Sequence, residues 1–157
     1  MFSSTAEYAL RAVVYLATQK EGLASSHAIA EATKVPQGYL SKVLKDLADA
    51  GIVNSQRGPG GGFSLAREAD QLTVLEVVNA VDRIERIRTC PLGIPSHGTQ
   101  LCRLHQKLDD VIALIEETFG SSTIAEMIEP SKSGTKCIFP TVKGAKAPAA
   151  PRRGAAR

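Results

Sequence analysis

Aromatic residues and cysteines are scarce in this chain of 157 residues. Aromatics make up 4% of it and tryptophan is absent, so the core has to be built from Ala, Val, Leu and Ile. Three cysteines are an odd number, and no secretory leader precedes them, which argues against a disulfide framework and favours a reducing cytoplasm. The longest apolar run, residues 12–17, is far too short to cross a membrane. We therefore expect a globular cytosolic protein without a membrane partner.

Acidic residues are absent from residues 131–157. Residues 1–130 contain 12 Lys/Arg and all 16 Asp/Glu, whereas the last segment contains the other seven basic residues. That segment also lacks hydrophobic periodicity and is predicted to be a disordered basic tail. An anionic partner therefore has to meet a local basic patch of the body, or the tail.

The first half of the chain has the element order of a winged helix-turn-helix. Helical periodicity predicts helices over residues 3–19, from 25 to about 35, and from 36 to 50, with Pro36 in the first turn of the third. Residues 52–56 and 62–66 alternate as strands around the glycine-rich loop 57–61, which is typical of a hairpin. The predicted class is mainly α with a small β-hairpin, and residues 1–70 form the DNA-binding region.

The second half is predicted to hold a linker helix, a cysteine-containing loop and a long helix within residues 71–130. Thr73 and Glu76 form a capping box for a helix reaching about Asp82. Residues 88–100 form the loop, and a short helix begins at Thr123. Apolar residues recur at helical spacing over residues 101–119, and this stripe is either a core helix or one side of a dimer seam. The stripe is wide enough to serve as both a core face and a dimer interface, so we predict a dimer.

The helix-turn-helix pattern predicts a surface that reads duplex DNA. A recognition helix presents its first residues to base edges in the major groove, and here these include Gln37, Ser41, Lys42 and Lys45. An antiparallel helical hairpin with a solvated lysine face is the alternative. The glycine loop after Arg57 favours DNA, because glycines allow close approach and an arginine suits a narrow minor groove. A phosphate-binding loop would need a following Lys-Ser/Thr and a helix, which are missing.

Cys90, Cys102 and His105 are candidate metal ligands. Thiolate and imidazole suit iron–sulfur clusters or zinc, although zinc modules usually contain closely spaced cysteine pairs. Two ordinary small residues and a histidine at a helix start are the alternative. Glu7 is interpreted as a solvated carboxylate of the first helix and Cys137 as a free thiol. No nucleophile–base pair is visible, so we do not expect an enzyme.

Several motifs together resemble the Rrf2 family of bacterial transcription regulators, which includes the iron–sulfur regulator IscR and the nitric-oxide regulator NsrR. They are residues 8–12 (YALRA), 29–30 (IA), 39–40 (YL), 47–51 (LADAG) and 57–62 (RGPGGG). The resemblance covers about residues 1–129. It implies a homodimeric winged-helix protein with a dimerisation helix at residues 101–119, base-reading Ser41 and Lys42, and Arg57 in the minor groove. The predicted DNA-binding set is Gln37, Tyr39, Ser41, Lys42, Lys45, Arg57 and Gly60.

The same resemblance bears on the cysteines. Cluster-binding members carry Cys-x5-Cys-x5-Cys-x2-His around a [2Fe–2S] cluster, and this chain has Cys90, Ser96, Cys102 and His105 at those places. The resemblance implies a cluster shell of two cysteines completed by His105 or by Glu7 of the other subunit. Two hypotheses stay open. One is a homodimeric repressor that binds a palindromic duplex and senses redox, iron–sulfur or nitric-oxide status through Cys90 and Cys102. The other is a cluster-free regulator of the same fold that responds to a small molecule or a partner protein.

Overall fold

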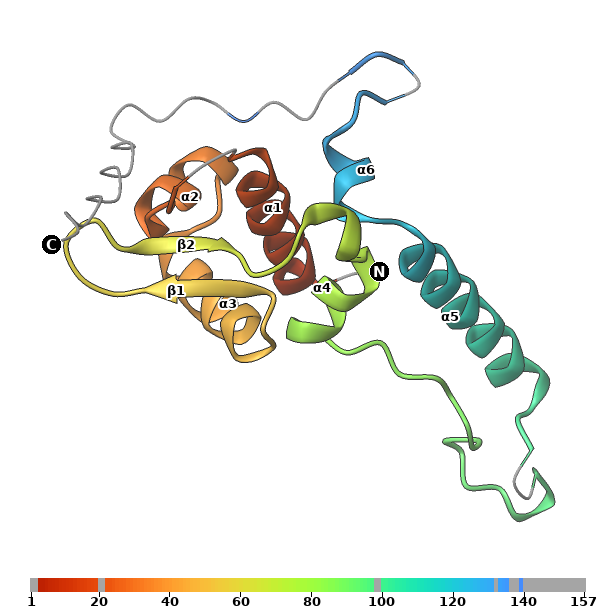
Figure 1. Cartoon of the computed structure of the whole chain (residues 1–157). Coiled ribbons are helices and arrows are strands. Elements are labelled where there is room, and N and C mark those ends of the chain that lie inside the picture. Colours follow the sequence, from red (N-terminus) through yellow and green to blue (C-terminus); the bar gives the residue numbers. More distant parts are fainter. Residues whose placement is uncertain (1–2, 20–21, 98–99, 132, 136–138, 140–157) are drawn as a thin grey trace, which may run out of the picture.

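The computed structural model describes residues 3–19, 22–97, 100–131, 133–135 and 139. Within these ranges the chain is mostly helical with one antiparallel hairpin, which confirms the predicted fold class. Figure 1 shows a body made of α1–α4, α6 and the hairpin, from which α5 projects. The elements are α1 (Ser4–Thr18), α2 (Ser26–Thr33), α3 (Gln37–Asp49), β1 (Val53–Gln56), β2 (Gly62–Leu65), α4 (Val74–Val81), α5 (Arg103–Ser121) and α6 (Ile124–Ile128).

Helix α1 is the centre of the body and packs against α2, α3, α4 and α6. It begins after Ser3, whose side chain accepts a hydrogen bond from the Ala6 N–H. Ala6, Ala9 and Ala12 are completely buried. Their small side chains let several helices approach α1 at once, which explains how a chain poor in aromatics forms a close-packed core.

The turn between α2 and α3 differs from the prediction at one residue. Helix α2 is capped by Ser25 and ends at Lys34, which has a left-handed φ of 58°. Pro36 is not in the first turn of α3 but caps it from outside, with an extended ψ of 130°. Its carbonyl accepts hydrogen bonds from the N–H groups of Tyr39 and Leu40, both at 3.0 Å. The first residue of α3 is therefore Gln37.

The hairpin is close to the predicted one and is joined by a third extended residue. Val53 pairs with Leu65 and Gln56 with Gly62, so each strand is one residue shorter than expected. Ala24 forms an isolated bridge with Phe63, donating to its carbonyl at 2.9 Å and accepting from its N–H at 2.8 Å. A Cβ on Gly62 would lie 2.6 Å from the Ala24 carbonyl oxygen, so this approach requires glycine. The bridge fixes the hairpin to the segment before α2.

Helices α4 and α6 begin side by side at the base of α5. The Thr73 capping box with Glu76 is present as predicted. Thr73 and Thr123 form an isolated bridge, in which the Val74 N–H donates to Ser122 and the Ile124 N–H donates to Leu72. After α5, this bridge holds the chain against the body. Helix α5 itself begins two residues later than predicted.

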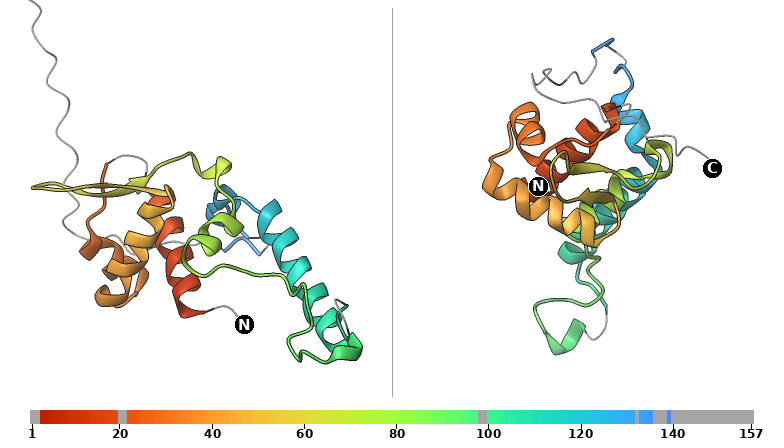
Figure 2. Two further views of the ribbon diagram at one scale, coloured as in Figure 1. Left: turned by 90° about the horizontal axis from the view of Figure 1, so that it is seen from below. Right: turned by 60° about the vertical axis from the view of Figure 1, so that its left-hand side comes forward.

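Helix α5 leaves most of its apolar side chains exposed. Leu104, Leu108, Val111 and Leu114 are 46–62% exposed, and Asp109 is the one residue of α5 that is fully buried. Phe119 alone of the predicted stripe packs against the core. In this chain the helix therefore contributes to the core only near its end, and Figure 2 shows it extending away from the body.

The predicted basic tail lies mostly outside the described residues, and so does Cys137. Two parts of it are described. Residues 131 and 133–135 form a turn, and the Phe139 ring packs edge-on against Tyr15 with ring centroids 5.4 Å apart. None of the described helices is long and apolar enough to cross a membrane.

Candidate functional site

The outer face of α3 carries the polar residues that the sequence singles out. Leu40, Val43, Leu44 and Leu47 are buried against the body, which turns the other side of the helix outward because of the 3.6-residue period. The side chains on that side are exposed: Gln37, Tyr39, Ser41, Lys42 and Lys45. The helix thus presents an amide, a phenol, a hydroxyl and two ammonium groups to a ligand.

The first turn of α3 is held by neighbouring aromatic and polar groups. The Tyr39 ring, 66% exposed, lies 6.3 Å from the Tyr8 ring, and the Arg11 guanidinium lies 6.0 Å from the same Tyr8 ring. The Ser41 hydroxyl donates to the Gln37 carbonyl at 3.1 Å. These contacts orient Tyr39 and Ser41, and the exposed Gln37 side chain has its Oε1 3.5 Å from Nδ1 of His27.

Lys45 is paired within its own helix. Its Nζ lies 2.6 Å from Oδ2 of Asp49, and the pKa of Lys45 is raised because of that hydrogen bond. Since both groups are exposed, the pair is weak and exchanges readily with solvent. The Lys45 ammonium has two further N–H donors that can contact a phosphate.

The wing places Arg57 and Gly60 beyond the helical body. Arg57 follows β1 and is exposed. The loop then turns back through Gly58 and Gly60, and Gly60 has a φ of 79°, which a residue with a side chain rarely adopts. Figure 2 shows the hairpin extending past the helices. The predicted DNA-binding residues thus occupy two exposed elements, α3 and the wing.

The structure brings Cys90, Cys102 and His105 together. Cys90 lies in the loop after α4, Cys102 is the N-cap residue of α5, and His105 is in its first turn. Nδ1 of His105 is 3.2 Å from Sγ of Cys102 and 3.6 Å from Sγ of Cys90. All three ligand atoms lie within 4.8 Å of one another. The backbone N–H and the ring of His105 lower the pKa of the Cys102 thiol to about 7, which increases its thiolate fraction near neutral pH.

The two other residues considered as ligands, Ser96 and Glu7, are both exposed. Ser96 is exposed in a short 3-10 helix, Pro95–His97. Glu7 is in the first turn of α1, where it forms an exposed ion pair with Arg11. Within one chain, the three-residue group therefore does not include Glu7.

A charged clamp holds the linker after α4 against α5. Arg86 donates to both carboxylate oxygens of Asp109, at 2.7 and 2.5 Å, and the Ile87 N–H donates to Oδ1 at 2.9 Å. The Arg86 hydrogen bond is the main cause of the lowered pKa of Asp109. Asp109 follows His105 by four residues, so the clamp and the Cys–Cys–His group share one face of α5. This pair was not predicted from the sequence, although the spacing of His105, Asp109 and Glu116 indicates a polar stripe on the helix.

Replacing Asp109 by asparagine is expected to weaken this clamp in a pH-dependent way. A carboxylate with a lowered folded-state pKa adds stability above its ordinary pKa of about 3.9, and that stability is lost as the pH falls through the folded-state value. Thermal unfolding should therefore show Asp109→Asn less stable than wild type at pH 7, with the difference shrinking toward pH 3. The exposed Asp110→Asn is the matched control and should change stability less. A difference that does not vary with pH would contradict the clamp.

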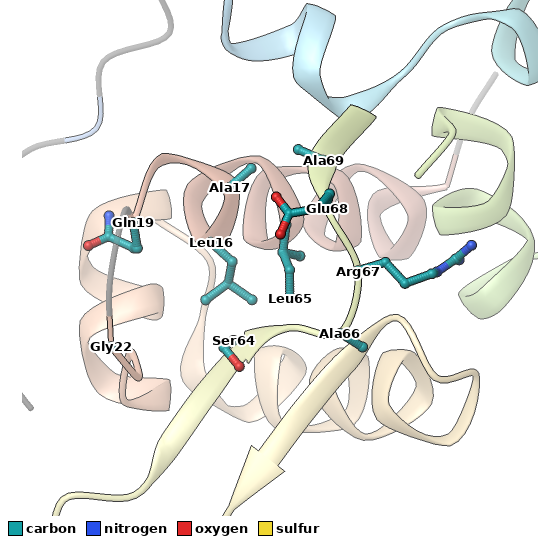
Figure 3. Close-up of a pocket in the computed structure, with 10 residues that line it drawn as sticks. All are labelled: Leu16, Ala17, Gln19, Gly22, Ser64, Leu65, Ala66, Arg67, Glu68 and Ala69. Carbon is teal, nitrogen blue, oxygen red and sulfur yellow. The ribbon is translucent and has the colours of Figure 1, made fainter. Parts of the chain in front are cut away.

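Among the hollows on the surface of the body are two with the following walls. One has a volume of about 330 Å³ and lies between the end of α1 and the segment leaving β2. Figure 3 shows Leu16 and Leu65 beside it and Arg67 directed away toward α4, where Arg67 pairs with Glu76 at 2.9 Å. The other, about 470 Å³, has apolar walls formed by Leu10, Val14, Val74, Met127 and Phe139, with Glu7, Arg11, Thr33 and Lys34 completing it.

Comparison with known proteins identifies the family. The model of the Rrf2 family, described as iron-dependent transcriptional regulators, matches residues 2–130. A protein of Aquifex aeolicus (strain VF5) named as an HTH-type transcriptional regulator is 32% identical over 143 residues, covering 89% of this chain and 97% of the relative.

Two solved structures are similar in fold. IscR of T. potens is 27% identical with a TM-score of 0.66, over 81% of this chain and 85% of that one. CymR (YrzC), the global cysteine regulator of B. subtilis, is 23% identical with a TM-score of 0.66, over 81% and 95%. These relatives are regulators, not enzymes, as the sequence predicts. The chain belongs to the Rrf2 family of transcriptional regulators, with a winged-helix DNA-binding fold.

Proposed function

We propose that this protein is a cytoplasmic, homodimeric repressor that binds a palindromic DNA operator. The observation that carries the proposal is the joint exposure of the polar face of α3 and of Arg57 on the wing. A helix of this kind enters the major groove, and an arginine on a protruding loop reaches the adjacent minor groove. The Rrf2 family model across residues 2–130 supports the same reading.

The dimer is proposed to form through α5. Leu104, Leu108, Val111 and Ile115 recur at spacings of four and three residues, so they form one stripe along the helix. The first three are exposed in the single chain, and a stripe of that kind is buried when two copies pack together. A twofold dimer would place two copies of α3 in successive major grooves, about 34 Å apart.

The signal is proposed to act through Cys90 and Cys102. The linker from α4 to α5 carries Cys90, whereas Cys102 and His105 begin the dimerisation helix. A change at these sulfurs would alter how the linker is fixed to α5, and hence the separation of the two recognition helices. A dithiol switch that forms a disulfide, or a bound metal, would both act at this point.

Operator selection followed by a binding titration tests the DNA-binding proposal. Duplexes selected from a random pool should share a palindrome, and fluorescence anisotropy should show tighter binding to it than to a scrambled duplex of equal length. Equal affinities would refute sequence-specific binding.

The sensing proposal is tested by Cys90→Ala and Cys102→Ala. Each variant should show a smaller change in operator affinity than wild type when oxidant, nitric oxide or chelator is added. An unchanged response would remove the cysteines from the sensing mechanism.

Removing residues 140–157 is expected to flatten the salt dependence of DNA binding. The deletion removes five Lys/Arg and keeps Phe139, which packs on Tyr15. Each phosphate that the tail neutralises adds roughly −0.9 to the slope of log K against log salt. The preference for operator over scrambled DNA should stay nearly constant. An unchanged slope would show that the tail does not contact DNA.

A second candidate is a cluster-free regulator that responds to a small apolar molecule. The apolar cavity of about 470 Å³ favours it, because volumes of this order accommodate small ligands. The cavity lies between α1, α4 and α6. An occupant would therefore contact α1 and also the two helices that begin next to the C-terminal end of α5. A ligand screen by thermal shift, repeated with Val14→Trp to fill the cavity, separates this function from one that depends on the cysteines.

A further inference from the structure

The residues present do not fit the [2Fe–2S] cluster that the family resemblance implies. Such a cluster needs two protein ligands on each of two iron atoms, and ligands on different irons lie further apart than ligands of one ion. Here Ser96 stands where cluster-binding relatives have a cysteine, and it is exposed. The group contains three donor atoms, all within 4.8 Å of one another. These donors surround one point and do not span two metal atoms.

The two sulfur–nitrogen distances in the group match the edges of a single tetrahedral site. With metal–sulfur bonds of about 2.3 Å and metal–nitrogen bonds of about 2.0–2.1 Å, tetrahedral angles place sulfur and nitrogen about 3.5 Å apart. The corresponding distances are 3.2 Å from Cys102 to His105 and 3.6 Å from Cys90 to His105. One ion could therefore contact all three atoms with small side-chain movements.

We propose that Cys90, Cys102 and His105 bind a single thiophilic divalent cation, Zn²⁺ or Fe²⁺, with the fourth position open to an external ligand. Two thiolates balance the double positive charge, and imidazole is a common ligand of both ions. Among the described residues no further His, Cys, Asp or Glu belongs to the group. A site with three protein ligands and one open position resembles catalytic and sensing sites more than closed structural ones.

The cation would attach the linker to α5 at a second point. Arg86 and Ile87 already hold the linker at Asp109, and the metal would hold it at Cys90, one helical turn nearer the start of α5. Loss of the ion, or attack on it at the open position, would release residues 88–102 while the clamp at Asp109 stays closed. This regulatory consequence rests on the proposed function, but the metal site itself does not.

Cobalt titration of the reduced, metal-free full-length protein under anaerobic conditions tests the site. We expect one equivalent of Co²⁺ per chain, with thiolate-to-cobalt charge-transfer absorption and the strong visible bands of tetrahedral cobalt, and displacement by Zn²⁺. Cys90→Ser, Cys102→Ser and His105→Ala should each weaken Co²⁺ binding at least tenfold, with folding checked by circular dichroism. Cys137→Ser is the matched control and should bind like wild type.

Two results would overturn the proposal: no tetrahedral cobalt spectrum in the folded wild type, or two irons and two sulfides per chain in protein purified without oxygen. Operator binding is measured on the same samples with and without Zn²⁺. If the metal binds and operator affinity stays constant, the site stands and its sensing role fails. If no metal binds and the apoprotein still binds its operator, the site fails and the DNA-binding function stands.

Discussion

Replacing Leu108 by aspartate should convert the proposed dimer to monomers and abolish tight binding to the proposed operator. Leu108 lies in the middle of the exposed stripe of α5, so the substitution would bury a charge in an apolar interface, which is strongly unfavourable. A monomer binds one half-site and loses the advantage of two linked contacts, which is worth about 10²–10⁴-fold in affinity. Sedimentation and anisotropy on the selected operator measure the two effects together.

The matched control is Gln106→Asp. Gln106 is exposed on the opposite face of α5, so this variant adds the same charge outside the proposed seam. It should remain dimeric and bind the operator like wild type. Because Leu108 contributes little to the core of one chain, Leu108→Asp should keep its helical content. A Leu108→Asp protein that is still dimeric would refute the proposed interface.

Much of the fold could be predicted because its signals are local. Ser3, Ser25 and Thr73 each cap a helix as their side-chain chemistry requires. The glycine-rich loop similarly marks the hairpin. Pro36 was misplaced by one position, since a proline suits both the N-cap and the first turn, and local sequence does not distinguish the two. Ala24 was missed because its bridge to Phe63 depends on the tertiary position of the hairpin.

The residues of the candidate metal site could be proposed from the sequence, but their arrangement in space could not. Thiol and imidazole chemistry and the family resemblance singled out Cys90, Cys102 and His105, whereas their proximity, on which the proposal of a single ion rests, is visible only in the structure. The Arg86–Asp109 clamp joins residues 23 positions apart, and no short motif signals it. Phe139 was assigned to the tail from average composition, and a single aromatic that packs on Tyr15 is invisible to such an average.

Arg57→Ala is expected to weaken operator binding by about 1–3 kcal/mol, which is roughly 5- to 150-fold. The arginine lies on the wing and is exposed, so its loss should change DNA binding much more than stability. An arginine in the minor groove reads groove width. The loss should therefore be larger on operators with A·T pairs at the wing position than on variants with G·C pairs there.

Lys42→Ala on α3 distinguishes a contact of Lys42 with a base edge from a contact with a phosphate. If Lys42 contacts a base edge, as the family resemblance implies, its loss should reduce affinity for the operator and leave affinity for scrambled DNA nearly unchanged. If it contacts a phosphate, both affinities should fall together and the salt slope should drop by about one. Arg83→Ala, which removes an exposed positive charge from the linker after α4, is the control for net charge. Arg57→Ala and Lys42→Ala proteins that bind the operator as tightly as the Arg83→Ala protein would show that neither α3 nor the wing touches DNA.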